Sequence, residues 1–333
     1  MAAHTPHLDP TRARALFAAA DGGTVLVVGD AMLDRYVIGA VDRISPEAPV
    51  PVLHVEAERT APGGAANVAA GVAALGATCR LVAAVGADGS GAALRAGLAE
   101  AGVAADDLVV SPRRPTTEKT RVLARRQQLV RIDREEAGPL EPVAAEAVAR
   151  AALAILAEAD AVVLQDYDKG LLSPSLAERI LAEARRRGIP AVVDPKLRHF
   201  FAFRGAAVIK PNARELAAAL GTERAPEDEA RLRRVLERLD AEHLLVTLGE
   251  RGMLLVSAAE PGVCRIPARA REVYDVSGAG DTVVAALAVA LLSRASMREA
   301  AELANVAAGL AVSRLGAVPI GRTELLNELA RRP

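Results

Sequence analysis

The residues best suited to chemistry lie in the segment YDVSGAGDT, at positions 274–282. Gly278 and Gly280 carry no Cβ, so the backbone can approach a ligand closely, and the apolar run that follows predicts a helix. The first N–H groups of a helix have no partner within it and favour an anion. We therefore predict phosphoryl transfer, in which Asp281 takes a proton from the attacking hydroxyl while the amides of Ala279 and Gly280 hold the phosphoryl oxygens.

A helix cap is the simpler interpretation of Asp281. A lone Asp near a helix start more often caps the helix than it catalyses a reaction, and glycines are common in turns. The choice between a cap and a base depends on whether the rest of the chain supplies a cleft with nucleotide and substrate sites.

Five apolar, β-branched runs predict strands buried on both faces of a sheet, at residues 24–28, 80–85, 161–165, 191–193 and 243–247. Helical patterns alternate with these strands, which indicates a doubly wound, mostly parallel α/β sheet flanked by helices. Ligands of such sheets bind beyond the carboxyl ends of the strands. Polar residues lie at or after several of these ends, namely Asp34, Lys169, Asp194, Lys196 and Thr247.

A smaller unit is predicted by the segment VIGAVDRISPEAPVPV. Its prolines cannot lie in a central strand, so they indicate edge strands that stand off the main sheet. With later strands at residues 116–123 and 127–134, they would form a small β-sheet lid. We expect a single domain over residues 1–333, with lid segments at about 35–56 and 114–135.

The lid is predicted to contact both a substrate and a second subunit. Lys119 and Arg121 stand two residues apart on a strand and share one face, where they could either meet a distal phosphate or only face solvent. The lid edge at residues 50–55 is apolar and has to be covered, so we expect a homodimer formed through the lid.

Two further motifs suit either a ligand or a helix start. Gly63 and Gly64 permit close backbone approach and Asn67 offers a donor and an acceptor, but a glycine turn with an Asn cap fits equally well. Asn212 and Glu215 have the spacing of a capping box.

Composition excludes several other classes of protein. Lys plus Arg count 41 and Asp plus Glu count 42, so neither a nucleic acid nor an anionic membrane is expected as a partner. The two cysteines and five histidines lack zinc-site spacing, which fits a reducing cytoplasm. The N-terminus shows no signal peptide or membrane span, and neither a P-loop nor a Rossmann fingerprint is present. We expect a cytoplasmic enzyme with another route to ATP.

The segments DVSGAGD and GGAAN resemble the signatures of the ribokinase-like, or phosphofructokinase-B, family of sugar kinases, and the resemblance extends over nearly the whole chain. It implies a ribokinase-like fold with ATP and Mg²⁺ as cofactors. The segments RISPEAPVPV, DYDKG and DPK further resemble the subgroup that phosphorylates D-glycero-β-D-manno-heptose 7-phosphate. The chain departs from this subgroup at Gln165, where Ser is expected, and many relatives have Thr in place of Ser277.

The resemblance assigns roles to particular residues. Substrate contacts would be Asp34, Gly63, Gly64, Asn67, Lys119, Arg121, Lys169, Asp194 and Lys196. ATP would lie beside Asn212, Glu215, Thr247, Gly249, Gly252 and Asn305. Glu215 would place Mg²⁺ through water, and Asp275 and Ser277 would border a monovalent-cation site, with K⁺ as the candidate ion.

The favoured function is ATP-dependent phosphorylation of the heptose phosphate at its anomeric C1 hydroxyl, to give heptose 1,7-bisphosphate for ADP-heptose and lipopolysaccharide-core or related heptose synthesis. A kinase of another sugar or hexose phosphate, or a catalytically silent regulator that binds sugar or nucleotide, is the alternative. Retention of Asp281 with its glycines argues against the regulator. Some heptose kinases are fused to a nucleotidyltransferase; because only a helix at residues 322–332 follows this kinase core, we expect the bisphosphate and no nucleotide sugar.

Overall fold

The computed structural model describes residues 8–125, 127–269 and 272–331. Within them, the strands form a nine-stranded sheet of order β13-β12-β11-β10-β9-β8-β1-β4-β5 and a four-stranded sheet of order β3-β2-β6-β7. The large sheet is parallel from β5 to β11, whereas β12 and β13 run antiparallel. The prediction of a doubly wound, mostly parallel sheet with a small β-sheet lid is confirmed.

The large sheet is built from apolar strands because both of its faces are covered. Its strands are β1 (Thr24–Gly29), β4 (Thr78–Gly86), β5 (Leu108–Ser111), β8 (Ala161–Gln165), β9 (Ala191–Asp194), β10 (Val208–Ile209), β11 (His243–Thr247), β12 (Met253–Ser257) and β13 (Cys264–Ile266). The sequence predicts the bounds of β8 and β11 to the residue.

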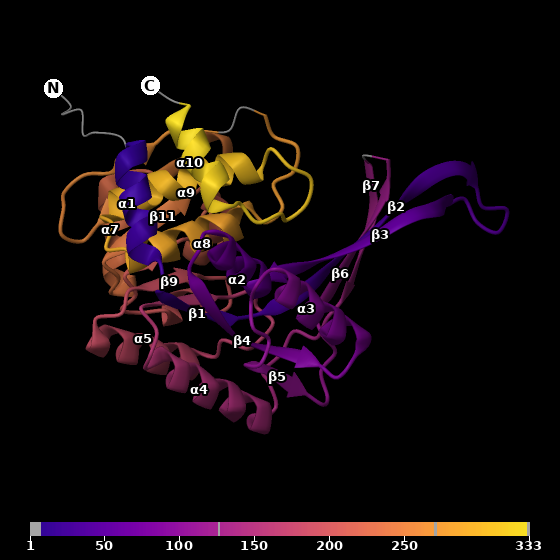
Figure 1. Cartoon of the computed structure of the whole chain (residues 1–333), viewed down its shortest axis with the longest axis horizontal. Helices are drawn as coiled ribbons and strands as arrows, with labels where there is room; N and C mark the ends of the chain where they lie inside the picture. The colour runs from indigo at the N-terminus through magenta and orange to yellow at the C-terminus, as the bar shows by residue number, and fades with distance from the viewer. Residues whose placement is uncertain (1–7, 126, 270–271, 332–333) are drawn as a thin grey trace.

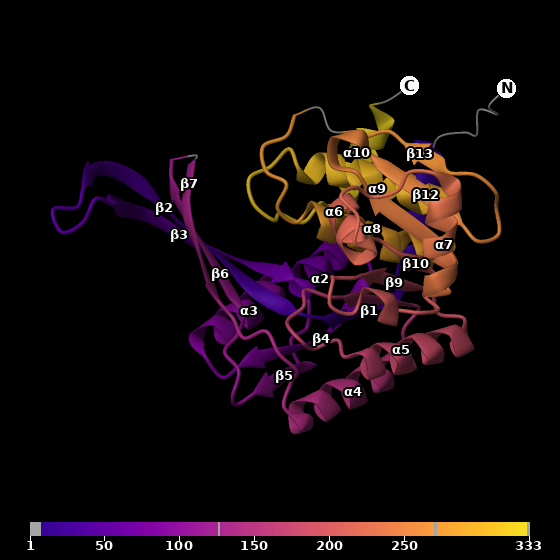
Figure 2. The ribbon, with the colours of Figure 1, turned by 180° about the vertical axis from the view of Figure 1, so that it is seen from behind.

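Helices cover the sheet on two sides. Figures 1 and 2 show α4 and α5 below the sheet and α2, α8 and α9 above it. The helices are α1 (Pro10–Ala20), α2 (Ala65–Ala74), α3 (Gly89–Glu100), α4 (Pro142–Leu156), α5 (Pro174–Arg187), α6 (Ala213–Leu220), α7 (Glu229–Leu239), α8 (Ala279–Leu292), α9 (Met297–Ala311) and α10 (Arg322–Ala330), with short 3-10 turns at Phe200–Ala202 and Gly249–Arg251. The α8 helix is apolar on all sides because it packs between the sheet, α2 and α9.

The lid is longer than its proline pattern suggests. Its strands are β2 (Ala31–Ile44), β3 (Pro51–Gly64), β6 (Glu118–Ala124) and β7 (Gln127–Arg134), and they project from the body as a twisted ribbon (Figure 1). Asp34 therefore lies inside β2 and not in a turn, and Gly63 and Gly64 end β3. Pro62 is tolerated because β3 is an edge strand.

One other sequence-based expectation, the end of the helix that begins at Met297, needs adjustment. The Ala-rich pattern from residue 297 predicts a helix to residue 315, but α9 ends at Ala311, before Gly316 takes a φ of 81°. None of the described helices is long and apolar enough to cross a membrane.

Candidate active site

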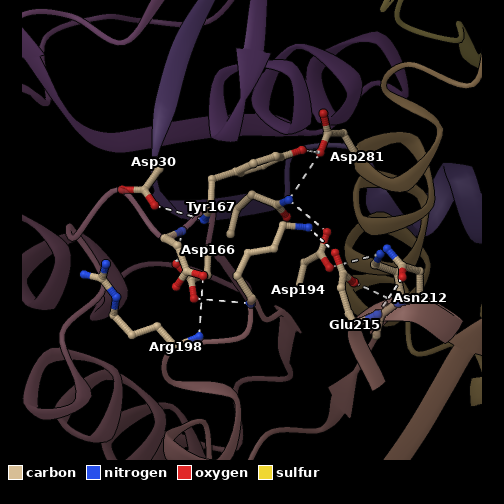
Figure 3. Close-up of polar contacts among 12 residues, drawn as sticks. Asp30, Asp166, Tyr167, Asp194, Arg198, Asn212, Glu215 and Asp281 are labelled. Atoms are coloured by element: carbon tan, nitrogen blue, oxygen red, sulfur yellow. Dashed lines mark hydrogen bonds and ion pairs between the residues drawn. The ribbon is translucent and has the colours of Figure 1, made fainter. Parts of the chain in front are cut away.

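Asp281 lies buried in the first turn of α8, beyond the carboxyl ends of β8 and β9 (Figure 3). Its Oδ1 accepts hydrogen bonds from the Tyr167 hydroxyl at 2.7 Å and Gln165 Nε2 at 3.2 Å, and its Oδ2 accepts one from Asn67 Nδ2 at 2.9 Å. All three donors come from other elements, and the N-cap of α8 is Gly278, which has no side chain. Asp281 is therefore not a helix cap.

The environment of Asp281 suits a general base. Burial raises the pKa of Asp281 to about 6, against the hydrogen bonds from Asn67 and Tyr167, which lower it. A base works best when its pKa is close to the operating pH. Asp281 can thus be ionised at neutral pH and still hold a proton better than an exposed carboxylate.

The start of α8 presents backbone amides beside this carboxylate. Gly278 has a left-handed φ of 75°, and a Cβ there would lie 2.9 Å from both Asn67 Nδ2 and Ala317 Cβ. The amide of Ala279 already donates to the carbonyl of Val276 at 3.3 Å. A Cβ on Gly280 would come no closer than 3.6 Å to Lys210 Nζ, so the space in front of Gly280 is open.

Lys210 is a buried cation that the sequence motifs do not reveal. Its Nζ lies 3.1 Å from Asp194 Oδ1, and both side chains are buried. Gln165 Nε2 donates to Asp194 Oδ2 at 2.9 Å and also to Asp281, so it joins the two carboxylates. Gln165, the departure from the subgroup pattern, thus has a structural role here. The open space at Gly280 is thus bordered by the ammonium of Lys210, and Asp281 is the next residue of the chain.

Asn212 and Glu215 form the predicted capping box at the start of α6. Glu215 Oε2 accepts from the Asn212 amide at 2.8 Å, while Oε1 forms an ion pair with Lys196 Nζ. Within the described ranges, no group of three His, Cys, Asp or Glu side chains could hold a metal ion. The Glu215 carboxylate offers oxygen atoms, the type of ligand that Mg²⁺ takes directly or through water.

Asp275 connects the two loops beside the start of α8. Its oxygens accept from the amides of Ser277 and Gly316, each at 2.9 Å. Burial opposes ionisation, but these hydrogen bonds leave the pKa of Asp275 below its usual value. The segment after α9 therefore lies against residues 275–277, where the resemblance implies a cation site.

An apolar cleft of about 460 Å³ lies on the other side of the α8 terminus. Its lining includes Thr247, Gly249, Gly252 and Asn305 together with Ala279 and Gly280. Asn305 Nδ2 donates to the carbonyl of Pro267 at 2.7 Å, which fixes one wall. Gly252 is required by the fold, because a Cβ there would lie 2.0 Å from the carbonyl oxygen of Ile266. Four of the six residues predicted to lie beside ATP thus line one cleft at the start of α8, whereas Asn212 and Glu215 are not part of its lining.

A larger hollow of about 960 Å³ lies away from these residues. Its lining includes Gly23, Asp160 and Pro190, which immediately precede β1, β8 and β9. This is the amino end of the sheet, and ligands of open α/β sheets bind at the carboxyl end. The smaller apolar cleft is therefore the better candidate for the nucleotide.

On the lid side, Arg121 forms an ion pair with Asp34 and lies over the ring of Tyr36, 5.4 Å from its centre. The Asp34 carboxylate also fills the space beside Gly63, where a Cβ would lie 2.5 Å from Asp34 Oδ2. Gly64 has a φ of 57° and a Cβ there would lie 2.5 Å from the carbonyl oxygen of Asp30. Protein atoms alone thus account for both glycines.

Lys119 and Lys169 form a second cationic group under the lid. Lys169 Nζ lies 2.7 Å from Glu135 Oε1. Burial lowers the pKa of Lys119, and the neighbouring charge of Lys169 lowers it further. The carboxylates of Glu135 and Asp133 raise the pKa of Lys119 in return, so this group combines cations and anions under the lid.

Comparison with known proteins places this site in a family. The model of the pfkB family of carbohydrate kinases matches residues 23–322. The bifunctional protein HldE of Azorhizobium caulinodans is 48% identical over 309 residues, which are 92% of this chain and 64% of that protein. HldE of Caulobacter vibrioides is also 48% identical, over 91% of this chain and 63% of that protein. The chain thus spans less than two thirds of the length of these relatives.

Solved structures share the fold. Arabidopsis thaliana ribokinase complexed with ribose and ATP has a TM-score of 0.72 at 24% identity, covering 92% of this chain and 99% of that one. Escherichia coli phosphofructokinase-2 in complex with potassium has a TM-score of 0.75 at 20% identity, covering 93% and 99%. Since the family match includes the lid, the α8 terminus and the apolar cleft, the chain belongs to the pfkB family of carbohydrate kinases.

Proposed function

We propose that the protein is an ATP-dependent kinase that phosphorylates D-glycero-β-D-manno-heptose 7-phosphate on its anomeric C1 hydroxyl, giving heptose 1,7-bisphosphate and ADP. The observation that carries the proposal is Asp281, a buried carboxylate with its pKa raised to about 6, at a helix start between an apolar cleft and a lid. The identity to HldE proteins and the RISPEAPVPV, DYDKG and DPK segments support a heptose substrate.

In the proposed mechanism, Asp281 removes the proton of the C1 hydroxyl as its oxygen attacks the γ-phosphorus of ATP. The new C1–O–P bond forms while the bond from the γ-phosphorus to its bridging oxygen breaks, and that oxygen leaves on ADP. The amide of Gly280 and the ammonium of Lys210 lie where the transferring group would carry negative charge. Mg²⁺ brought by ATP would neutralise the other phosphate oxygens beside Glu215.

The distal phosphate of the substrate is assigned to Lys119 and Lys169. Arg121 is a weaker candidate than its sequence position suggests, because it is already paired with Asp34. A dianionic phosphate would displace Glu135 from Lys169 and relieve the repulsion between the two lysines. Asp34 remains the candidate for a sugar hydroxyl.

K⁺ and a second subunit complete the proposal. The similar phosphofructokinase-2 of Escherichia coli forms a complex with potassium, and the region of Asp275 and Ser277 is where we place a K⁺ site in this chain.

The edge strand β3 exposes Val55, and Val50 precedes it, so we propose that two lids pair across a two-fold axis. A monomeric mass at micromolar concentration, together with full activity, would exclude this dimer.

A panel of sugar phosphates tests the substrate. The heptose 7-phosphate should give the highest kcat/KM with ATP. Equal or better use of fructose 6-phosphate would replace the heptose assignment with the hexose-phosphate alternative. Tight binding of sugar and ATP without ADP release would favour the silent regulator.

A further inference from the structure

The loop after β8 is fixed to the protein interior by a second buried carboxylate. Asp30 Oδ2 accepts from the amides of Tyr167 at 2.9 Å and Lys169 at 3.0 Å, and Oδ1 accepts from the amide of Leu171 at 3.2 Å. From the other side, Arg114 Nη1 donates to the carbonyl of Lys169 at 2.5 Å. Asp30 and Arg114 are both buried. The backbone of this loop therefore has little freedom to move.

The side chain of Tyr167 is held as firmly as its backbone. Its ring lies beside Gly64, where a Cβ would be 3.4 Å from Tyr167 Cε2. Lys196 Nζ lies 5.0 Å from the centre of the ring. The hydroxyl reaches Asp281 Oδ1 at 2.7 Å (Figure 3). The ring thus has one orientation, which points its hydroxyl at the base.

The donors around Asp281 are divided unequally between its two oxygens. Among the residues that the structure describes, Oδ1 accepts from Tyr167 and Gln165, whereas Oδ2 accepts only from Asn67. An ionised carboxylate oxygen has two lone-pair sites. Oδ1 is therefore saturated, and the free acceptor site of Asp281 is on Oδ2.

We propose that Tyr167 is a positioning residue for the base: its hydroxyl occupies Oδ1, so that Oδ2 of Asp281 receives the proton of the sugar hydroxyl. This inference rests on the proposed kinase function, because it requires Asp281 to act as the base. It assigns no proton transfer to Tyr167. The phenol donates the same hydrogen bond before and after the transfer.

Electrostatics keep Tyr167 protonated. Burial raises the pKa of Tyr167 well above its usual value, and the carboxylates of Asp281 and Asp194 raise it further. The charged groups around Asp281 are Asp194, which raises the pKa of the base, and Lys210, which lowers it; Lys196 lies near as well. Tyr167 therefore donates to Asp281 as a neutral phenol.

The test is the pH dependence of kcat for Tyr167→Phe. Loss of a donor to the ionised form raises the pKa of the base, so the acid limb of the profile should move upward by about one pH unit, with kcat near wild type above the limb. KM for ATP should stay unchanged. Ser257→Ala is the control, because its hydroxyl lies 2.8 Å from His243 Nδ1 at the opposite end of the sheet, and its profile should coincide with wild type.

An unmoved limb, or an equal loss of kcat at every pH, would overturn the inference. A second measurement replaces the three tyrosines with fluorotyrosine, which is a more acidic phenol and a stronger donor. It should shift the acid limb in the direction opposite to the shift in Tyr167→Phe. In the protein that contains Tyr167, the acid limb should then move to lower pH, and a limb that stays in place contradicts the proposal. In Tyr167→Phe, the same replacement of the remaining tyrosines should not move the limb. Near-normal turnover by Asp281→Asn would instead refute the kinase mechanism itself, so the two failures are distinguishable.

Discussion

At the scale of single residues, Asp281 differs from an ordinary first-turn Asp in the partners of its carboxylate. A cap accepts hydrogen bonds from the amides of its own helix, whereas Asp281 accepts from Asn67, Gln165 and Tyr167 on other elements. These donors only partly offset the cost of burying a carboxylate, so its pKa is raised. A raised pKa is expected of a general base, whereas a helix cap gains nothing from it.

The first prediction is the sign of the pH dependence. Because the base must be ionised, kcat should be constant above about pH 7 and fall as the pH decreases through about 6, the raised pKa of Asp281. Burial also raises the pKa of Asp166 to about 6, so Asp166→Asn is the necessary control. The pH profile of Asp166→Asn should keep the acid limb, because the base is still Asp281. A profile that is flat down to pH 5 in the wild type would contradict the assignment of the base.

Gly280→Ala separates stability from function at the same helix. The new Cβ would lie 3.6 Å from Lys210 Nζ, an ordinary contact, and Ala is favoured over Gly in a helix by about 0.5 to 1 kcal/mol. Tm should therefore hold or rise slightly, while kcat/KM for ATP falls because the methyl group occupies the phosphoryl space. Unchanged kinetics would show that no ligand approaches Gly280.

At the scale of elements, the loop after β8 connects the two halves of the proposed site. It carries Tyr167, which touches Asp281, and Lys169, which lies under the lid. Both amides are held by Asp30, at the end of β1, the strand that pairs with β8. The order of strands in the sheet is thus what brings the base and the lid cations together.

Asp30→Asn should loosen this loop. An amide side chain has one acceptor atom in place of two, so the amides of Tyr167 and Lys169 should exchange with solvent about tenfold faster or more, as expected for loss of a hydrogen bond to a charged group. Asp160→Asn is a matched control, because Asp160 Oδ2 accepts from the Thr24 amide at the opposite end of the sheet. Equal protection of the two loop amides in both variants would refute the role of Asp30.

The lid cations are tested by their effect on two kinds of substrate. Lys119→Ala should raise KM for the sugar phosphate roughly tenfold to a hundredfold, the value of one charge-assisted hydrogen bond, and leave KM for ATP nearly unchanged. A sugar without the phosphate should be little affected. Arg43→Ala, which removes an exposed cation near the end of β2, is the control. If KM rises equally for the sugar phosphate and for the sugar without the phosphate, Lys119 supports the lid and does not bind the phosphate.

At the scale of the whole molecule, the sequence predicts where the sites lie better than which side chains form them. Strand and helix patterns place the ends of β8 and β11, and motifs place Asp281. Asp30, Tyr167 and Lys210 gain their roles only through partners more than a hundred positions away or on a different strand, and no local pattern records such pairs. The strand around Asp34 is also not evident from the sequence, because the prolines suggest a shorter lid, whereas β2 and β3 continue to the body of the protein.

Asp281 directly follows Ala279 and Gly280, which line the apolar cleft, and is hydrogen-bonded to Asn67 and Tyr167. One substitution should therefore stop the reaction while both ligands still bind. Asp281→Asn is that substitution, because it keeps the shape of the side chain and removes the base.

The decisive measurement is therefore kcat of Asp281→Asn with ATP and the heptose 7-phosphate, alongside calorimetric titration of ATP. Loss of a general base lowers a rate by about 10² to 10⁴, so kcat should fall by that factor while the affinity for ATP stays near wild type. A variant that retains near-normal turnover would contradict the account, because Asp281 would then serve only the structure of the fold.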